Sequence, residues 1–285
     1  MVLAAVGQIC STASLAHNLA QCKVAVQKAV AAGAKILFLP EASDYIATSP
    51  SESLSLCQST TTSPFVLGLQ SLASQHSLAI NVGVHEPSPS PKHLYNTLLH
   101  ISPQGSIVAT YRKLHLFDVD LSSTNGPVLK ESATTSPGTT ISAPTPSPIG
   151  LLGMQICFDL RFPEPSLQLS RKGATTLLYP SAFTPRTGAA HWSTLLRARA
   201  IENQCFVVAA AQVGKHNAKR ESYGHSVVVD PWGEVLLELG GLEEWNAKGE
   251  GWEPEVGVVD VDLDRLGDVR AGMPLRRRTD VYPEL

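Results

Sequence analysis

The sequence predicts an α/β protein of four layers, α-β-β-α, built from two similar halves of one domain. Strand-like and helical segments alternate along the chain, the same order of elements occurs twice, and marker residues repeat at a fixed offset. Gly33 and Pro40 correspond to Gly173 and Pro180, about 140 residues later, which is far longer than a solenoid repeat. Two sheets with helices on one face each would bury their other faces together. The alternative is coincidence, since any α/β chain repeats strands and helices.

The first half begins with a strand and then a helical pattern whose apolar residues recur near a 3.6-residue period. Gly33 suits the end of that helix, because glycine is common just after a helix C-terminus. A Ser/Thr-rich loop from 48 to 63 and a short helix come later in this half. The expected strands are 4–10, 35–39, 78–84 and a hairpin of 97–101 with 107–111.

The second half repeats this order. A helix is expected from Pro163 to Gly173, because proline suits the first turn of a helix and glycine suits its exit. A longer helix is expected from His191 to Asn203. The expected strands are 149–157, 175–179, 205–210 and a hairpin of 226–230 with 234–237.

Composition limits the classes of partner. The 285 residues carry a net charge of −3 and are 43% hydrophobic, which is typical of a compact globular protein. Without a basic patch no nucleic-acid partner is expected, and without an apolar run of about 20 residues no membrane partner is expected. We expect a catalytic domain over residues 1–265 and a C-terminal tail over 266–285 that packs at a subunit interface.

The five cysteines are odd in number and widely spaced, with no CxxC pair. This pattern favours a reducing compartment over a disulfide framework. We therefore expect a cytoplasmic protein, with a mitochondrial copy left open. The nine histidines show no ligand spacing, and the sequence contains no Walker loop, GxGxxG, GxSxG or HExxH motif. No metal and no cofactor is expected.

Three polar residues follow buried strands, which is where α/β folds usually place their active sites. Cys157 lies at a strand–turn–helix corner, where a nucleophile is exposed and a helix N-terminus stabilises a thiolate. Glu41 follows an apolar strand, so burial is expected to raise its pKa toward that of a general base. Lys113 could stabilise an oxyanion. Each residue also has a purely structural interpretation. Cys157 could be a buried thiol, Glu41 a surface acid or an acid at a helix N-terminus, and Lys113 a solvated lysine.

The segments around these residues occur in the order Phe38-Leu39-Pro40-Glu41, Tyr111 to Phe117, and Cys157-Phe158-Asp159-Leu160-Arg161-Phe162-Pro163-Glu164. In this the chain closely resembles the nitrilase superfamily of carbon–nitrogen hydrolases along nearly its whole length. The resemblance implies a Glu–Lys–Cys triad of Glu41, Lys113 and Cys157 on a four-layer sandwich. Cys10 occupies the corresponding place in the first half, but the Asp-Leu-Arg-Phe-Pro-Glu segment follows only Cys157, which favours Cys157 as the nucleophile.

Within the superfamily the segments Pro180-Ser181-Ala182-Phe183 and Arg220 to Ser226 resemble those of deaminated glutathione amidases. That likeness implies hydrolysis of the terminal amide of deaminated glutathione, releasing its 2-oxo acid part through a cysteine thioester, with ammonia as the leaving group. Omega-amidases, which act on amides such as 2-ketoglutaramate, and N-carbamoyl hydrolases remain alternatives. An interaction module without catalysis is the non-enzyme alternative.

The resemblance also implies roles for residues beyond the triad. Glu131 is a second carboxylate that positions Lys113 or the substrate, or a purely structural one. The backbone N–H of Phe158 joins Lys113 at the oxyanion. Arg161 binds a substrate carboxylate or else forms an internal salt bridge to Glu164 or Asp159. Phe183 and Thr187 serve as pocket wall and hydrogen bonder, and a basic loop with Lys215, Lys219 and Arg220 faces a distal carboxylate. The expected partners are a small amide bearing carboxylates and a second copy, joined through helices 163–173 and 191–203 as a homodimer.

Overall fold

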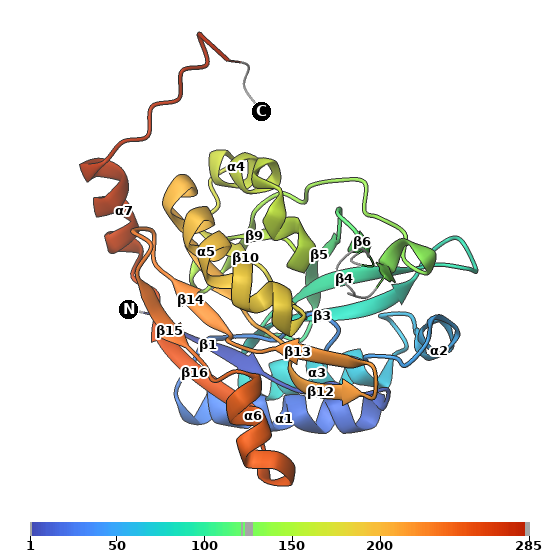
Figure 1. The fold of residues 1–285 in the computed structure, drawn as a ribbon. Helices are drawn as coiled ribbons and strands as arrows, with labels where there is room; N and C mark the ends of the chain where they lie inside the picture. The colour runs from blue at the N-terminus through green and yellow to red at the C-terminus, as the bar shows by residue number, and fades with distance from the viewer. Residues whose placement is uncertain (1, 121, 123–127, 283–285) are drawn as a thin grey trace.

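Two mixed sheets form the centre of the computed structural model, which describes residues 2–120, 122 and 128–282 (Figure 1). In spatial order, the strands of the first sheet are β16 (Glu255–Asp260), β1 (Leu3–Gln8), β2 (Ile36–Phe38), β3 (Ala79–Pro87), β4 (Leu94–Ile101) and β5 (Ile107–Arg112). Those of the second are β8 (Thr145–Ser147), β9 (Gly150–Met154), β10 (Thr176–Leu178), β11 (Phe206–Ala209), β14 (Val227–Val229) and β15 (Val235–Glu238).

The two sheets repeat one pattern of strand directions. β1, β2 and β3 are parallel neighbours, and β16 and the β4–β5 hairpin extend them in antiparallel fashion. In the second sheet β9, β10 and β11 are parallel neighbours. β8 extends them in antiparallel fashion at one edge, as β16 does in the first sheet, and the β14–β15 pair does so at the other edge. The predicted duplication is therefore confirmed, with one addition. The edge strand β16 comes from near the end of the chain, so the first sheet is completed only after the second.

Helices cover the outer face of each sheet and complete the four predicted layers. The first sheet is covered by α1 (Leu15–Ala31) and α3 (Pro64–His76), and the second by α4 (Pro163–Arg171) and α5 (Pro185–Asn203). Figure 1 shows these two helix pairs on opposite sides of the sheets. The inner strands are buried on both faces, and their successive side chains point alternately to the two faces. In β2, Ile36 and Phe38 face the second sheet, whereas Leu37 packs with the helices.

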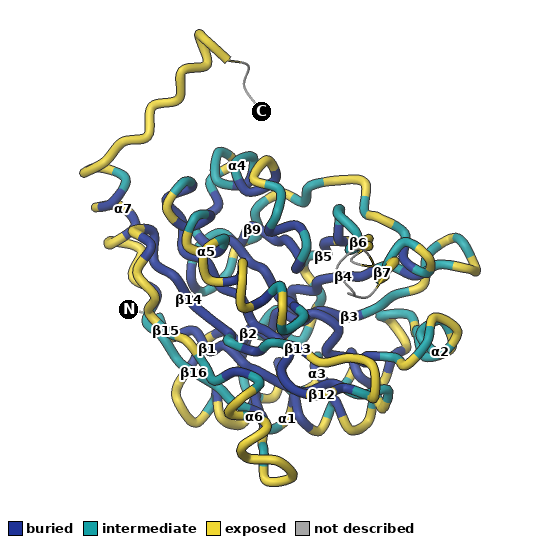
Figure 2. The backbone as a smooth tube through the Cα atoms, in the orientation of Figure 1, coloured by how far each residue is buried: buried dark blue, intermediate teal, exposed yellow. Residues whose placement is uncertain are grey.

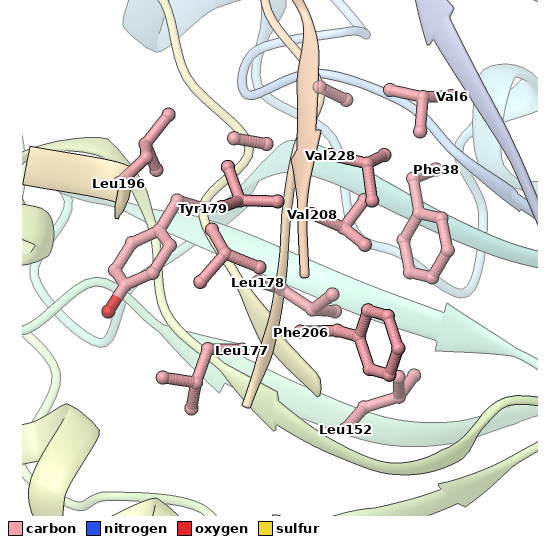
Figure 3. Packing of buried hydrophobic residues seen from close by; sticks show 14 of the residues in the cluster. Val6, Phe38, Leu152, Leu177, Leu178, Tyr179, Leu196, Phe206, Val208 and Val228 are labelled. Carbon is pink, nitrogen blue, oxygen red and sulfur yellow. The ribbon is translucent and has the colours of Figure 1, made fainter. Parts of the chain in front are cut away.

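Side chains from both sheets pack in the layer between them. Figure 3 shows Phe38 of the first sheet near Val208, Val228 and Phe206 of the second. On the other face of the second sheet, Tyr179 points toward the helix layer in the same view. The inner strands form the continuous buried region in Figure 2, whereas the edge strands β15 and β16 are intermediate or exposed. This packing fixes the strand ends from which the site is built.

Two sequence expectations for local structure were wrong. The segment expected as a loop from 48 to 63 contains α2 (Pro50–Leu56), whose first turn is capped by the Ser49 side chain. Serine and proline there form a helix start, which the high Ser/Thr content obscured. The helix expected to begin at His191 begins six residues earlier, at Pro185.

Further short elements connect the layers. They are β6 (Asp118–Asp120), β7 (Val128–Lys130), β12 (Val213–Asn217), β13 (Arg220–Tyr223), α6 (Leu242–Lys248), α7 (Leu263–Gly272) and the 3₁₀ helices Glu131–Ala133, Cys157–Arg161 and Gly249–Gly251. The β12–β13 hairpin and the β6–β7 pair stand apart from the two large sheets. Both pairs contribute residues to the cavity described below.

The expected boundary after residue 265 falls within α7, where Leu266 and Val269 are buried against the domain. Residues 273–282 are exposed and lead away from the body of the chain (Figures 1 and 2). The packing of this tail against a second subunit, and the homodimer through α4 and α5, stay predictions. Among the helices of the described residues, none has the length and apolar character needed to cross a membrane.

Candidate active site

One cavity of about 380 Å³ collects the expected catalytic and substrate-binding residues, and Lys219 and Arg220 of the expected basic loop also line it, whereas Lys215 does not. Those catalytic and substrate-binding residues are Glu41, Lys113, Glu131, Cys157, Phe158, Arg161, Phe183 and Thr187. They come from both halves of the chain and from loops at the ends of strands in both sheets. The volume lies within the usual range of small-molecule sites. The structure thus places these residues together, and their chemical roles stay predictions at this point.

The Glu41 carboxylate lies beyond the end of β2 and is 4% exposed. Its Oε1 accepts hydrogen bonds from Asn96 Nδ2 at 2.7 Å and from Lys113 Nζ at 2.9 Å. Its Oε2 accepts the backbone N–H of Ala182 at 2.9 Å, and the Cys157 thiol lies close enough to affect the pKa of the carboxylate. Each oxygen is therefore held in a fixed direction, so the carboxylate meets the thiol in a defined geometry.

The backbone beneath Glu41 is tightly constrained. A Cβ added to Gly83 of β3 would lie 2.5 Å from Glu41 Cα, so only glycine lets the two segments approach this closely. Ala42 has a φ of +53°, a conformation that costs a non-glycine residue free energy. Gln212 compensates by donating from Nε2 to the carbonyl oxygens of Glu41 and Ala42 at 3.0 and 3.3 Å. Contacts on two sides thus maintain this turn.

Cys157 occupies the corner that the sequence predicted. It is the first residue of a 3₁₀ helix, has a φ of +47° and is 8% exposed. Its backbone N–H donates to Pro180 O at 3.0 Å, which ties it to the end of β10. Strained backbone of this kind is concentrated at functional sites, where surrounding contacts maintain it. The corner directs the thiol toward Glu41 and into the cavity.

Asp159 is the fully buried anchor of the Cys157 corner. Its Oδ2 accepts the hydroxyl of Tyr111 at 2.7 Å and the backbone N–H of Ile156 at 3.0 Å. Its Oδ1 accepts the backbone N–H and the Nδ1–H of His115 at 3.0 and 2.7 Å. Because Tyr111 and His115 flank the predicted catalytic lysine, Asp159 fixes the cysteine corner to the lysine segment. His115 is accordingly a structural hydrogen bonder.

The Lys113 ammonium, 2% exposed, lies between two carboxylates. Its Nζ contacts Glu41 Oε1 at 2.9 Å and the two oxygens of Glu131 at 2.9 and 3.1 Å. Glu131 Oε2 also accepts the backbone N–H of Phe117 at 2.7 Å, and Glu131 Oε1 accepts Asn96 Nδ2 at 3.2 Å. Glu131 therefore orients Lys113 and also holds the loop after β5. Its contacts fit both the positioning role and the structural role that the sequence left open.

The charges of these groups follow from burial and neighbours. Burial disfavours charge on Lys113, but Glu131 and Glu41 hold its pKa well above the ordinary value. Burial likewise opposes ionisation of Glu41, but Lys113 and the Cys157 thiol lower its pKa below the ordinary value. The expectation that burial raises the pKa of Glu41 was thus wrong in sign. The apolar strand before Glu41 indicates that its carboxylate is desolvated, but it does not indicate that the Lys113 ammonium lies against that carboxylate.

The Cys157 thiol stays protonated in the resting site. Its burial and the nearby Glu41 carboxylate raise its pKa well above the ordinary value, against the opposing effect of Lys113. The expected stabilisation of a thiolate by a helix N-terminus is therefore outweighed. Cys10 is also buried, which raises the pKa of its thiol to about 12, but it does not line the cavity. The resting state is a neutral thiol beside an ionised carboxylate and an ammonium.

Arg161 and its neighbours form the wall next to the thiol. The guanidinium lies 5.6 and 5.8 Å from the ring centres of Phe158 and Phe183, and its Nη2 is 3.1 Å from His191 Nδ1. Within the described residues it forms no ion pair, so the expected alternative of an internal salt bridge to Glu164 or Asp159 is not found. A cation without a carboxylate partner is therefore available to a ligand.

Several residues that shape the site were not assigned a role from the sequence. Asn96, Gly83, Asp159 and Gln212 position the predicted groups, and of these only Asp159 belongs to a segment that the sequence marked as catalytic. Asn96 is a polar residue within a largely buried strand, which is a signal that could have identified it. Within the ranges that the structure describes, no group of three or more His, Cys, Asp or Glu side chains is arranged so that it could hold a metal ion.

Comparisons with known proteins agree with this geometry. The family model for carbon–nitrogen hydrolases matches residues 3–271. A probable hydrolase, nit2, of Schizosaccharomyces pombe is 46% identical over 286 residues, covering all of both chains. The deaminated glutathione amidase of Mus musculus is 43% identical over 290 residues, covering 99% of this chain and 85% of its own length. The crystal structure of the Caenorhabditis elegans NitFhit protein matches with a TM-score of 0.89 and 40% identity, covering 99% of this chain and 66% of that chain.

Replacing Glu41 by Gln is expected to lower the pKa of the Cys157 thiol. The substitution removes the carboxylate that opposes a thiolate and leaves the Lys113 ammonium in place. The measurement is the alkylation rate of Cys157 by iodoacetamide as a function of pH, whose midpoint should move to lower pH. Glu86→Gln is the matched control, since that carboxylate pairs with Arg112 outside the cavity. A midpoint that stays in place or rises in the Glu41 variant contradicts the electrostatic argument.

Proposed function

Because this chain belongs to the carbon–nitrogen hydrolase family, we propose that it is an amidase that cleaves deaminated glutathione with Cys157 as nucleophile. The observation that carries the proposal is the buried Glu41–Lys113–Glu131 cluster beside a thiol on a strained corner. The named activity of relatives with 40–43% identity supports the choice of substrate. The basic residues of the cavity support it as well, because this substrate carries two carboxylates.

The first half of the reaction forms a thioester. Glu41 takes the proton of the Cys157 thiol while the sulfur attacks the amide carbon, so the proton does not have to leave in advance. The Lys113 ammonium and the backbone N–H of Phe158, in the first turn of its 3₁₀ helix, bind the oxygen that becomes negative. Glu41 then gives its proton to the amide nitrogen. The carbon–nitrogen bond breaks, and the acyl group remains on sulfur.

The second half removes the acyl group. Glu41, again a carboxylate, takes a proton from water, and the water oxygen attacks the thioester carbon. Lys113 and Phe158 bind the same oxygen as before. The carbon–sulfur bond breaks, the proton passes from Glu41 to the sulfur, and the acid leaves. Glu131 takes no proton in this scheme. It holds Lys113 in the charged form and in place, which its two contacts to Nζ support.

The leaving group depends on the amide. Deaminated glutathione is a secondary amide in which a 2-oxo diacid is joined to cysteinylglycine, so Glu41 protonates the amine of cysteinylglycine and 2-oxoglutarate is released. Ammonia, the leaving group of the sequence-based scheme, would come only from a primary amide such as 2-ketoglutaramate. The substrate carboxylate beside the oxo group suits Arg161, because a guanidinium can donate two parallel hydrogen bonds to a carboxylate. Phe183 and Thr187 complete that side of the cavity.

Replacing Cys157 by Ala should reduce the release of 2-oxoglutarate from deaminated glutathione by about 10³-fold or more, because the thioester can no longer form. Cys10→Ala is the matched control: that thiol is buried in the first half, outside the cavity, and its loss should leave turnover unchanged. Undiminished turnover in the Cys157 variant would overturn the mechanism. A wild-type kcat/KM that strongly favours 2-ketoglutaramate over deaminated glutathione would instead assign the chain to the omega-amidases.

Replacing Arg161 by Gln should lower kcat/KM for deaminated glutathione by about 10- to 150-fold, the equivalent of losing charge-assisted hydrogen bonds. Arg161→Lys keeps the charge but not the paired donors, so its loss should be smaller. A neutral amide without carboxylates serves as the control substrate and should be cleaved equally well by all three proteins. An equal loss on the neutral amide would show that Arg161 supports the cavity wall rather than the ligand.

We also propose that the chain forms a homodimer in a reducing compartment, the cytoplasm or a mitochondrial copy. The five cysteines of the sequence are all free, which fits such a compartment. The helices α4 and α5 lie on the outer face of the second sheet and can meet the same helices of a second copy. Light scattering should then give twice the chain mass of 30.4 kDa. A mass that stays at the monomer value over the micromolar range would exclude the dimer.

A further inference from the structure

A histidine that the scheme above does not use lines the same cavity. His85 lies on β3 and is held from behind by Asp44: its backbone N–H donates to Oδ2 at 2.8 Å, and its Nδ1 meets Oδ1 at 2.9 Å. The ring stacks on Tyr45, with 4.3 Å between ring centres. The side chain is 14% exposed. The imidazole is therefore fixed in position and orientation, as a binding group must be.

The contact with Asp44 determines which nitrogen faces the cavity. A carboxylate accepts hydrogen bonds, so Nδ1 of His85 carries a proton. Among the described residues, the bonds to the His85 side chain involve Nδ1 alone, and Nε2 is left to the cavity that the ring lines. If the ring is neutral, Nε2 can only accept a hydrogen bond; if the ring is charged, Nε2 donates one and attracts an anion.

The surroundings of His85 favour the charged ring. Burial by itself disfavours the charge, but Asp44, and more weakly Glu41 and Glu131, hold the pKa of His85 above its ordinary value. Tyr45 packs on the ring face as a neutral group, since burial keeps its hydroxyl protonated. A charged ring would offer its Nε2–H to a ligand in the cavity that His85 lines.

We propose that His85, oriented by Asp44, is a second anion-binding subsite of the cavity, which holds the carboxylate of the leaving amine. The proposal rests on the proposed function and deepens it. Deaminated glutathione has one carboxylate on the 2-oxo acid part and one at the glycine end, with the scissile amide between them. His85 and Arg161 line the same cavity as Cys157, so the cavity has one such group for each carboxylate.

Arg161 and His85 occupy different sides of the cavity. Arg161 is attached to the second sheet through the Cys157 corner and lies against Phe158 and Phe183. His85 is attached to the first sheet, next to Tyr45. A ligand with its reacting carbon at Cys157 can place one carboxylate at each cation. Arg161 takes the acyl side, so His85 is left for the amine side.

The other cations of the cavity are less suitable partners. Lys113 already contacts two carboxylates. Lys130, Lys219 and Arg220 line the opening but are exposed, so water and salt weaken their attraction for an anion. His85 is largely removed from water, where a charge-assisted hydrogen bond is stronger. The specific contact to the amine part is therefore assigned to His85.

The test compares wild type with His85→Gln, which removes the charge and keeps an amide that can bond to Asp44. Three amides are used: deaminated glutathione, the same compound with its glycine carboxylate converted to a carboxamide, and 2-ketoglutaramate. KM for deaminated glutathione should rise by about 10-fold or more with little change in kcat, the signature of lost binding common to ground and transition states. Kinetics on the carboxamide and on 2-ketoglutaramate should be unchanged by the substitution.

His93→Gln is the matched control, the same substitution in a histidine near the turn after β3, outside the cavity. An unchanged KM for deaminated glutathione in His85→Gln would overturn the subsite. So would an equal loss on all three amides. Because all three carry the oxo-acid carboxylate, an equal loss would assign His85 to the acyl side or to the support of Glu41.

Binding separates this proposal from the proposed function. The affinity of Cys157→Ala for deaminated glutathione and for its carboxamide is measured calorimetrically, with and without His85→Gln. If wild type does not cleave deaminated glutathione, the proposed function fails. The subsite still stands if His85→Gln weakens binding of the carboxylate compound alone by about 10-fold or more. If the substitution weakens neither compound, or if neither compound binds, the subsite is overturned.

Discussion

The buried ammonium of Lys113, shared between Glu41 and Glu131, is the interaction on which the rest of the site depends. A charge removed from water costs several kcal/mol unless it is paired and hydrogen-bonded, and here each of the three groups compensates the others. The three residues follow β2, β5 and β7, so the cluster joins segments far apart in the chain. The same contacts set the charges: an ammonium and a carboxylate are stable side by side, and the thiol next to them remains protonated.

Holding these charges together requires unusual backbone on both sides. The Cys157 corner has a left-handed conformation, and Ala42 beside the carboxylate has another. Ala42 follows β2 of the first sheet and Cys157 follows β9 of the second, so the face-to-face packing of the sheets brings the two strained turns together. Gly83 permits the close approach under Glu41, and Asp159 fixes the cysteine corner to the lysine segment. The strain is maintained because several independent contacts determine each position.

Much of the fold could be predicted because its signals are local. Short apolar runs identified the inner strands, and the repeated Gly and Pro markers revealed two halves whose strand directions match. Local signals failed where two of them competed. Ser49 and Pro50 start a helix, but the surrounding Ser/Thr-rich composition indicated a loop. The edge strand β16 lies about 250 residues from its partner β1, and no local pattern can reveal such a pairing.

The sequence by itself determined the family, the layered fold and the identity of the polar residues at strand ends, because strand patterns and motif segments are properties of neighbouring residues. The tertiary structure decided how these residues interact. It showed that the pKa of Glu41 falls rather than rises, that Arg161 has no ion-pair partner within the described part of the chain, and that Asp44 orients His85 toward the cavity. Electrostatic effects depend on distances between groups remote in sequence, and only the folded chain sets those distances.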